Sequence, residues 1–382
     1  MSTIYDVAIL GGGIVGRTLA LLLARERLRV ALVEAPPRPD AEPDIRAYAL
    51  NAAARALLQE VRAWPDEPQL ATPVRTMWVA DATDGRAGWP EVAAALRFDE
   101  PAPGEPLAWI VDVPALQQRL EQALHFQHGV QRLTVEAPPP HAALTVVCEG
   151  RHSTTRAAAG MAYDTVAYPH TAIAARLRCQ RPHGAVARQW FRGDEIVALL
   201  PLDGPDGQRV ALVWSVPHAR AAELLALPGA DFAAALQTAC GEALGSMTLE
   251  GRPVGWPLQR SLARPWVRPG WALAGDAAHA MHPLAGQGLN TGLADVAELV
   301  RVLRAREYWR GLGDLRLLRR YERARAAPVA AMLAATDALY GLFAHPDARV
   351  AAARRWGLRA VDRLEPLKRW FIQQAAGSTA PV

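Results

Sequence analysis

The sequence predicts an α/β fold with an inserted antiparallel β-sheet and C-terminal helices. A short apolar strand, a glycine-rich turn and an amphipathic helix follow one another over residues 7–27, as in the first half of a βαβ unit. Four β-like runs separated by short turns lie between residues 172 and 216, and this spacing favours antiparallel pairing. From about residue 315 onward the pattern is helical, with breaks expected at Pro328, Pro346 and Pro366.

Composition and charge narrow the class of protein. The 382 residues are 51% hydrophobic and 21% charged, which is typical of a globular chain of about two domains. The formal net charge is +4 and the basic residues are scattered, which argues against a nucleic-acid partner. The three cysteines form no CxxC pair, so they indicate neither a disulfide framework nor a zinc site.

The same features indicate where the protein works. No apolar run reaches the ~18 residues that a membrane-spanning helix needs. The N-terminus, MSTIYDVAIL, has no basic region and predicts a first strand rather than a signal peptide. We therefore expect a cytoplasmic protein, with peripheral attachment to the inner membrane as the alternative.

The N-terminal turn predicts a Rossmann-like, dinucleotide-binding unit. Gly11, Gly13 and Gly16 form a GxGxxG motif directly after the strand Val7–Leu10. In such a motif the first glycine permits a tight turn, the second lets the backbone approach a pyrophosphate, and the third lets helix and strand pack closely. A lone GxGxxG is weak, but here it stands between a strand and a helix.

The residues that follow the turn complete this unit. Ile14 and Val15 begin the helix, whose free N–H groups and positive dipole end suit phosphates. A second apolar strand, RVALVE, ends on Glu34, about 20 residues further on, where a carboxylate can bind a ribose diol. An acid at this position favours FAD or NAD over NADP.

A second glycine-rich segment, residues 275–292, predicts a polyol and anion site. An apolar strand, Trp271–Ala274, leads into a turn at Asp276, and a helix begins near Leu289 or Asn290. The carboxylate of Asp276 can bind ribityl hydroxyls, and N–H groups at the helix start can stabilise negative charge. His279 and His282 are tempting metal ligands, but no second Cys/His cluster completes a zinc site, so we expect no metal.

This segment, GDAAHAMHPLAGQGLNTGLAD, resembles the corresponding motif of FAD-dependent aromatic hydroxylases, the class A flavoprotein monooxygenases. Within that family it is most similar to the ubiquinone-biosynthesis hydroxylases. The positions in register are Gly275, Asp276, His279, Pro283, Gly286, Gln287, Gly288, Asn290, Gly292 and Asp295. The resemblance implies a fold like that of para-hydroxybenzoate hydroxylase, in which an antiparallel substrate-binding sheet is inserted into a Rossmann-like FAD-binding domain.

Two shorter motifs extend the resemblance. In CEGRHSTTR, Gly150, Ser153 and Arg156 match a second FAD motif, but Glu149 stands where the family has an aspartate. The extra methylene keeps the charge and moves it, so the family's FAD and NAD(P)H role at this position is in question. The family's DxRxxAL pattern is also present, and it implies that Arg46 lies near the flavin and its pyrophosphate.

The resemblance implies an activity and a set of roles. NADPH or NADH is the co-substrate that reduces FAD, and one oxygen atom of O2 is transferred to an activated phenol ring. Pro283 is expected against the flavin ring, with His282 beside it as a candidate substrate contact. The polar edge of the ring is expected to be flanked by the helix start, which comprises Gly286, Gln287, Gly288, Leu289 and Asn290.

The substrate, partners and domain limits are the least determined expectations. The leading substrate is a polyprenylphenol of ubiquinone biosynthesis; the alternatives are another aromatic in pigment or secondary metabolism, and a non-oxygenating FAD-binding subunit of a biosynthetic complex. The sequence leaves open whether the protein forms a homodimer. We expect an FAD-binding domain at 1–72, 98–168 and 263–345, a substrate-binding domain at 73–97 and 169–262, and a helical region at 346–382. This last region is expected to pack on the FAD-binding domain, with a membrane or partner surface as the alternative.

Overall fold

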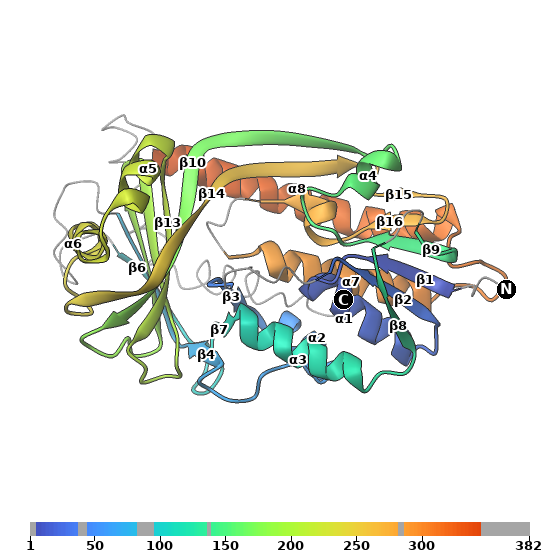
Figure 1. Cartoon of the computed structure of the whole chain (residues 1–382), viewed down its shortest axis with the longest axis horizontal. Helices are drawn as coiled ribbons and strands as arrows, with labels where there is room; N and C mark the ends of the chain where they lie inside the picture. Colours follow the sequence, from blue (N-terminus) through green and yellow to red (C-terminus); the bar gives the residue numbers. More distant parts are fainter. Residues whose placement is uncertain (1–4, 37–43, 82–94, 136–138, 282–285, 345–382) are drawn as a thin grey trace.

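The computed structural model describes residues 5–36, 44–81, 95–135, 139–281 and 286–344. Its helices and strands form three sheets along the long axis of the molecule (Figure 1). A six-stranded sheet lies at one end, an eight-stranded sheet at the other, and a three-stranded sheet between them. The region predicted at 346–382 lies outside the described residues.

The six-stranded sheet confirms the predicted Rossmann-like unit. Its order is β15-β16-β9-β1-β2-β8, and every neighbouring pair is parallel except β15 with β16. Its central strand is almost wholly buried because both faces are covered, as parallel sheets require. The strands are β1 Tyr5–Leu10, β2 Val30–Glu34, β8 Val130–Thr134, β9 Ala142–Val147, β15 Val267–Arg268 and β16 Trp271–Leu273.

Helices pack around this sheet and carry the predicted motifs. Helix α1 follows the GxGxxG turn, and α7 starts at Gly288, one residue before the predicted start; the two helices contact each other. Their apolar residues form one core with those of the sheet. The helices are α1 Ile14–Arg25, α2 Ala52–Glu60, α3 Val113–His125, α4 Thr154–Ala158 and α7 Gly288–Arg304.

The four runs predicted between residues 172 and 216 pair antiparallel in the eight-stranded sheet, as expected, and the sheet contains one parallel pair in addition. Its order is β17-β14-β10-β13-β12-β11-β5-β6, and β5 lies parallel to β11 because it reaches the sheet from the earlier part of the chain. The strands are β5 Thr76–Asp81, β6 Ala95–Asp99, β10 Ala162–Cys179, β11 Val186–Arg192, β12 Glu195–Pro201, β13 Arg209–Pro217, β14 Met247–Arg264 and β17 His279–Ala280. Helices α5 (His218–Ala226) and α6 (Gly229–Cys240) lie at its outer end (Figure 1).

The three-stranded sheet joins the two larger ones. It consists of β3 (Ala47–Leu50), β7 (Ala108–Asp112) and β4 (Ala71–Val74), all antiparallel. Its apolar residues pack against one face of the eight-stranded sheet. Strand β3 therefore lies between that face and the segments that follow β16.

Helix α8 runs without a break from Leu315 to Ala344, so the break predicted at Pro328 is wrong. Proline removes one backbone donor and one hydrogen bond, and here packing on both sides of Pro328 outweighs that loss. On the N-terminal side Tyr321 is fully buried and donates to the carbonyl of Leu273 at 2.8 Å. On the other side Asp337 accepts a hydrogen bond from Arg260 of β14 at 2.9 Å. In the described part of the chain, no helix is both long and apolar enough to cross a membrane.

Replacing Gly16 by alanine is expected to lower the free energy of unfolding of the cofactor-free protein by about 1–3 kcal/mol. A Cβ atom at residue 16 would lie 2.0 Å from the carbonyl oxygen of Gly11, so α1 must move away from β1. Urea denaturation measures the change. Gly13→Ala is the control, because a Cβ there meets no atom within 4 Å. Equal stability of the two variants would contradict this account of the turn.

Candidate active site

The GxGxxG turn leaves one face of the backbone open. Gly11 has a φ of +117°, and a Cβ on it would lie 2.5 Å from the carbonyl oxygen of Cys148. Gly16 is equally constrained by close approach, whereas Gly13 borders open space. The N-cap of α1 has no side-chain hydrogen bond and its first turn holds no acidic residue. The N–H groups at Ile14 and Val15 and the helix dipole are thus available to an anion such as a pyrophosphate.

Glu34 lies at the end of β2 beside this turn, but two arginines that the sequence analysis missed pair with its carboxylate. Arg17 of α1 contacts Oε1 at 2.8 Å and Arg132 of β8 contacts Oε2 at 2.7 Å. Both arginines also pair with Glu121. Each arginine also donates through Nε, Arg17 to Oε1 at 3.0 Å and Arg132 to Oε2 at 2.7 Å. Because a carboxylate can accept about four hydrogen bonds, a ribose diol would have to displace part of these contacts.

The residues after β16 pack directly against the start of α1. A Cβ on Gly275 would lie 3.2 Å from Val15, and one on Gly292 would lie 3.0 Å from it. Val15 thus brings together the GxGxxG turn, the Gly275-Asp276 turn and the start of α7. Asp276 is exposed, and the surrounding protein raises its pKa by limiting its hydration.

Arg46 precedes β3 and contributes positive potential to the same space. Its guanidinium binds Asp44 at 2.6 Å, and this hydrogen bond raises the pKa of Arg46. The charge of Arg46 in turn opposes the rise in the pKa of Asp276. Tyr48 lies under the guanidinium, with 5.8 Å between Arg46 Cζ and the ring centroid.

The start of α7 offers a second helix N-terminus. Its N-cap, Gln287, makes no side-chain capping hydrogen bond, and a Cβ on Gly288 would meet open space. Asn290 has a connecting role: its amide accepts from Asn51 N at 3.0 Å and donates to Ala49 O at 2.8 Å. Leu289 is buried in the core.

Gly286 lies beside β3, where a Cβ would be 3.4 Å from Ala49. His282 and Pro283, the predicted catalytic residues, lie outside the described residues. No group of three or more His, Cys, Asp or Glu side chains placed to hold a metal occurs in the described ranges.

The side chain of Glu149 is bound by residues of its own loop. Its carboxylate accepts hydrogen bonds from Ser153 at 2.6 Å and from Thr155 at 2.9 Å, while Gly150 presents an open backbone face. Arg156 links this loop to the Gly275-Asp276 turn, since it donates to Ala277 O at 3.2 Å. The longer acid therefore orders the loop that the resemblance assigns to FAD.

Asp295 ties the turn to two helices. Its side chain is fully buried, and it accepts hydrogen bonds from Gly275 N at 3.0 Å, from His279 Nε2 at 2.6 Å and from Arg325 Nε at 2.8 Å. Burial alone would raise the pKa of Asp295, but His279 and Arg325 hold it below its usual value. His279 thus serves the loop's structure, and the sequence carried no signal for Arg325.

The eight-stranded sheet presents different residues on its two faces. Trp190 and Trp214 lie in the outer core, where the Trp214 ring is 6.0 Å from that of Phe232 in α6. Leu200 lies on the opposite face and packs toward Ala49 of β3. The face that can cover a bound flavin is therefore the one that carries Leu200.

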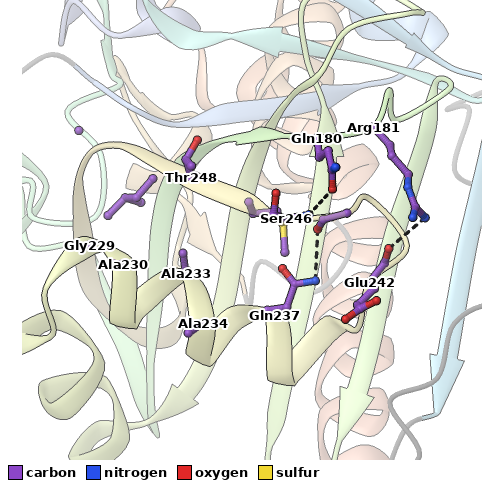
Figure 2. A pocket seen from close by; sticks show the side chains of 14 residues that line it. Gln180, Arg181, Gly229, Ala230, Ala233, Ala234, Gln237, Glu242, Ser246 and Thr248 are labelled. Carbon is purple, nitrogen blue, oxygen red and sulfur yellow. Dashed lines mark hydrogen bonds between the residues drawn. The ribbon is translucent and has the colours of Figure 1, made fainter.

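A separate cavity of about 800 Å³ lies on the outer side, beside α6 (Figure 2). Its polar groups bind one another: Ser246 N donates to Gln180 Oε1 at 3.2 Å, and Gln237 Nε2 donates to Gly245 O at 3.2 Å. Because these polar groups are paired with one another, they offer little to a ligand in this cavity. None of the described residues of the predicted motifs lines it.

The described site fits FAD. Two uncapped helix starts, the open backbone of Gly13 and the exposed carboxylate of Asp276 converge around Val15. The first helix start suits the pyrophosphate, Asp276 suits the ribityl hydroxyls, and the α7 start suits the negative charge of a reduced flavin ring.

Replacing Asp295 by asparagine is expected to lower the free energy of unfolding by about 3–5 kcal/mol at neutral pH, because Arg325 and His279 lose a buried partner. Since the folded-state pKa of Asp295 lies below its usual 3.8, the stabilisation is present above that pH and disappears as the pH falls through the folded-state value. Urea denaturation of wild type and variant, at several pH values, measures this difference.

The control is Glu298→Gln on the same helix, which removes a surface pair with Arg301 and is expected to cost less than about 1 kcal/mol. A variant of Asp295 as stable as this control, or a difference that shrinks already between about pH 7 and 5, would show that the buried charge contributes nothing.

Comparison with known proteins identifies the family. A family model described as an FAD binding domain matches residues 118–336. The chain is 33% identical over 398 residues to the ubiquinone hydroxylase UbiL of Rhodospirillum rubrum, covering 98% of this chain and 90% of that protein. It is 31% identical to the 3-demethoxyubiquinol 3-hydroxylase of Escherichia coli, with 97% and 98% covered.

Solved structures agree with this fold. The p-nitrophenol 4-monooxygenase PnpA of Pseudomonas putida matches with a TM-score of 0.76 at 16% identity, over 100% of both chains. PqsL of Pseudomonas aeruginosa, described as a probable FAD-dependent monooxygenase, matches with a TM-score of 0.73 at 20% identity, over 92% of this chain and 99% of that one. The chain therefore belongs to the family of FAD-dependent aromatic hydroxylases, and it is an FAD-dependent monooxygenase.

Proposed function

We propose that this monooxygenase hydroxylates the aromatic ring of a polyprenylphenol in ubiquinone biosynthesis, with NADPH or NADH and O2 as co-substrates. The observation that carries the proposal is the similarity, over nearly the whole chain, to two proteins named for ubiquinone hydroxylation. When bound, FAD supplies the redox chemistry: it takes up a hydride and delivers one oxygen atom of O2 to the ring, the other leaving as water.

The protein binds and orients the flavin from one side. The Gly11–Gly16 turn and the start of α1 hold the pyrophosphate, with Glu34 at the ribose and Arg46 nearby as a positive charge. Asp276 holds the ribityl chain, and Glu149 and Gly150 border it. The N–H groups from Gly286 to Asn290 favour negative charge at the polar edge of the ring. Pro283 lies against the ring and His282 beside the substrate in this proposal.

The eight-stranded sheet supplies the other wall. Its face with Leu200 packs on β3, next to the α7 start, so a substrate between sheet and flavin is removed from water. Exclusion of water matters because it keeps activated oxygen from being lost without hydroxylation. The domain division proposed is the one predicted from the sequence, with FAD bound by 1–72, 98–168 and 263–345 and substrate covered by 73–97 and 169–262.

An apolar, prenylated substrate resides in a lipid bilayer, so we also propose a cytoplasmic enzyme that works at the inner membrane surface or within a biosynthetic complex. The region 346–382 is proposed to pack on the FAD-binding domain, with contact to the membrane or a partner as the alternative. A homodimer is compatible with this arrangement.

Purified protein reconstituted with FAD is expected to oxidise NADH or NADPH several-fold faster when a short-chain prenylphenol is added, and to release a product heavier by one oxygen atom. Absorbance at the nicotinamide band and mass spectrometry measure the two quantities. If only unprenylated phenols are hydroxylated, the substrate belongs to another aromatic pathway and not to ubiquinone biosynthesis. FAD binding without any hydroxylated product would indicate a non-oxygenating subunit.

A further inference from the structure

One face of the eight-stranded sheet is covered at its two ends and less covered in its middle. Near β3 it packs through Ala187, Leu200 and Ala211. Toward α8 it packs through Tyr168, Ala172 and Leu258, against Tyr340. Since side chains alternate along a strand, the residues between these two contact zones on the same face can be read from the strand register.

The middle of this face is one row of paired residues across six strands. Gln189 of β11 pairs with Ala198 of β12, which pairs with Val213 of β13. The row continues from Val213 through Ala174 to Val254, and on the other side from Gln189 to Val79. Paired residues in a sheet point to the same side. Gln189, Ala198 and Val213 each lie two positions from a residue that packs toward β3, namely Ala187, Leu200 and Ala211, and are thus on the same face.

This row borders space that the described protein does not fill. Val213 and Ala198 are partly exposed, whereas Leu212 and Trp214, which flank Val213 on the outer face, are each only 1% exposed. The row's side chains are small and apolar apart from Gln189. A ring with apolar substituents can lie against such a surface.

Gln189 is the exception in this row. It is only 8% exposed, and none of the hydrogen bonds within the described ranges involves its amide. By contrast Arg176, the charged residue nearest to β3 on this face, binds Asp112 and the carbonyl of Arg46. The amide atoms of Gln189 are not sealed from solvent, so they can bind a ligand in the unfilled space that Ala198 and Val213 border.

We propose that the side-chain amide of Gln189 hydrogen-bonds the hydroxyl oxygen on the substrate's aromatic ring, and so sets which ring carbon faces the flavin. This inference rests on the proposed function. An amide both donates and accepts, so it can hold the hydroxyl in its neutral form or after loss of its proton. The apolar row beside it takes the rest of the ring.

The test compares two probes, 2-geranylphenol and geranylbenzene, which differ only in the ring hydroxyl. Dissociation constants are measured from the change in flavin absorbance when each probe is added to the FAD-loaded enzyme. Wild type is expected to bind the phenol about 10- to 100-fold more tightly than the hydrocarbon, as one hydrogen bond in a buried site allows. Gln189→Met, which keeps length and removes both hydrogen-bonding groups, is expected to abolish that preference.

The variant's affinity for geranylbenzene is expected to remain within about twofold of wild type, because the apolar contacts are unchanged. The cofactor-free variant is expected to melt close to wild type, because the amide makes no hydrogen bond within the described ranges. Gln208→Leu, at an exposed glutamine in the turn before β13, is the matched control and leaves both affinities unchanged. Gln189→Leu serves as the second variant if the first folds poorly.

Equal weakening of both probes, or an unchanged preference for the phenol, would overturn the role of Gln189 while leaving the hydroxylase proposal intact. A wild-type enzyme that binds and hydroxylates no prenylated phenol would remove the proposed function itself, and this inference with it.

Discussion

A single buried charge holds together the segments that bind the cofactor. A carboxylate without water is tolerated only where hydrogen bonds and opposite charges replace its hydration. Asp295 meets this requirement through the backbone of Gly275, the ring of His279 and the guanidinium of Arg325. Displacing any one of them removes part of what replaces the hydration of this carboxylate. The Gly275-Asp276 turn, α7 and α8 therefore keep one mutual arrangement, and the contacts of Val15 add the GxGxxG turn to it.

Helix α8, which supplies Arg325, also positions the eight-stranded sheet on the substrate side of the site. Beyond Pro328, α8 contacts the long strands β10 and β14, where Tyr340 donates to His170 at 2.7 Å and Asp337 binds Arg260. Strand β14 pairs with β17, in which His279 lies opposite Leu262. The sheet face that carries Gln189 and the flavin-binding turn are thus positioned by shared elements, which is what accurate delivery of one oxygen atom to one ring carbon requires.

Local patterns predicted the parts of the fold that depend on local chemistry. The GxGxxG turn, β1, α1 and the start of α7 are set by glycine spacing and apolar periodicity, so their positions were accurate to a residue or two. Strand β14 was missed because Pro253 and Pro257 and two glycines interrupt its pattern, although β10 supplies pairing along its length. Arg17, Arg132 and Arg325 were missed because an ion pair between distant residues leaves no trace in either local sequence.

The most direct measurement of the central claim, that three distant segments form one FAD site, is amide hydrogen exchange with and without saturating FAD. Backbone N–H groups that bind or border the cofactor exchange more slowly when it is present. The account predicts slower exchange in residues 11–17, 275–278 and 287–291 together, with the same dependence on FAD concentration. Protection confined to residues 11–17, with unchanged exchange in the other two segments, would contradict it.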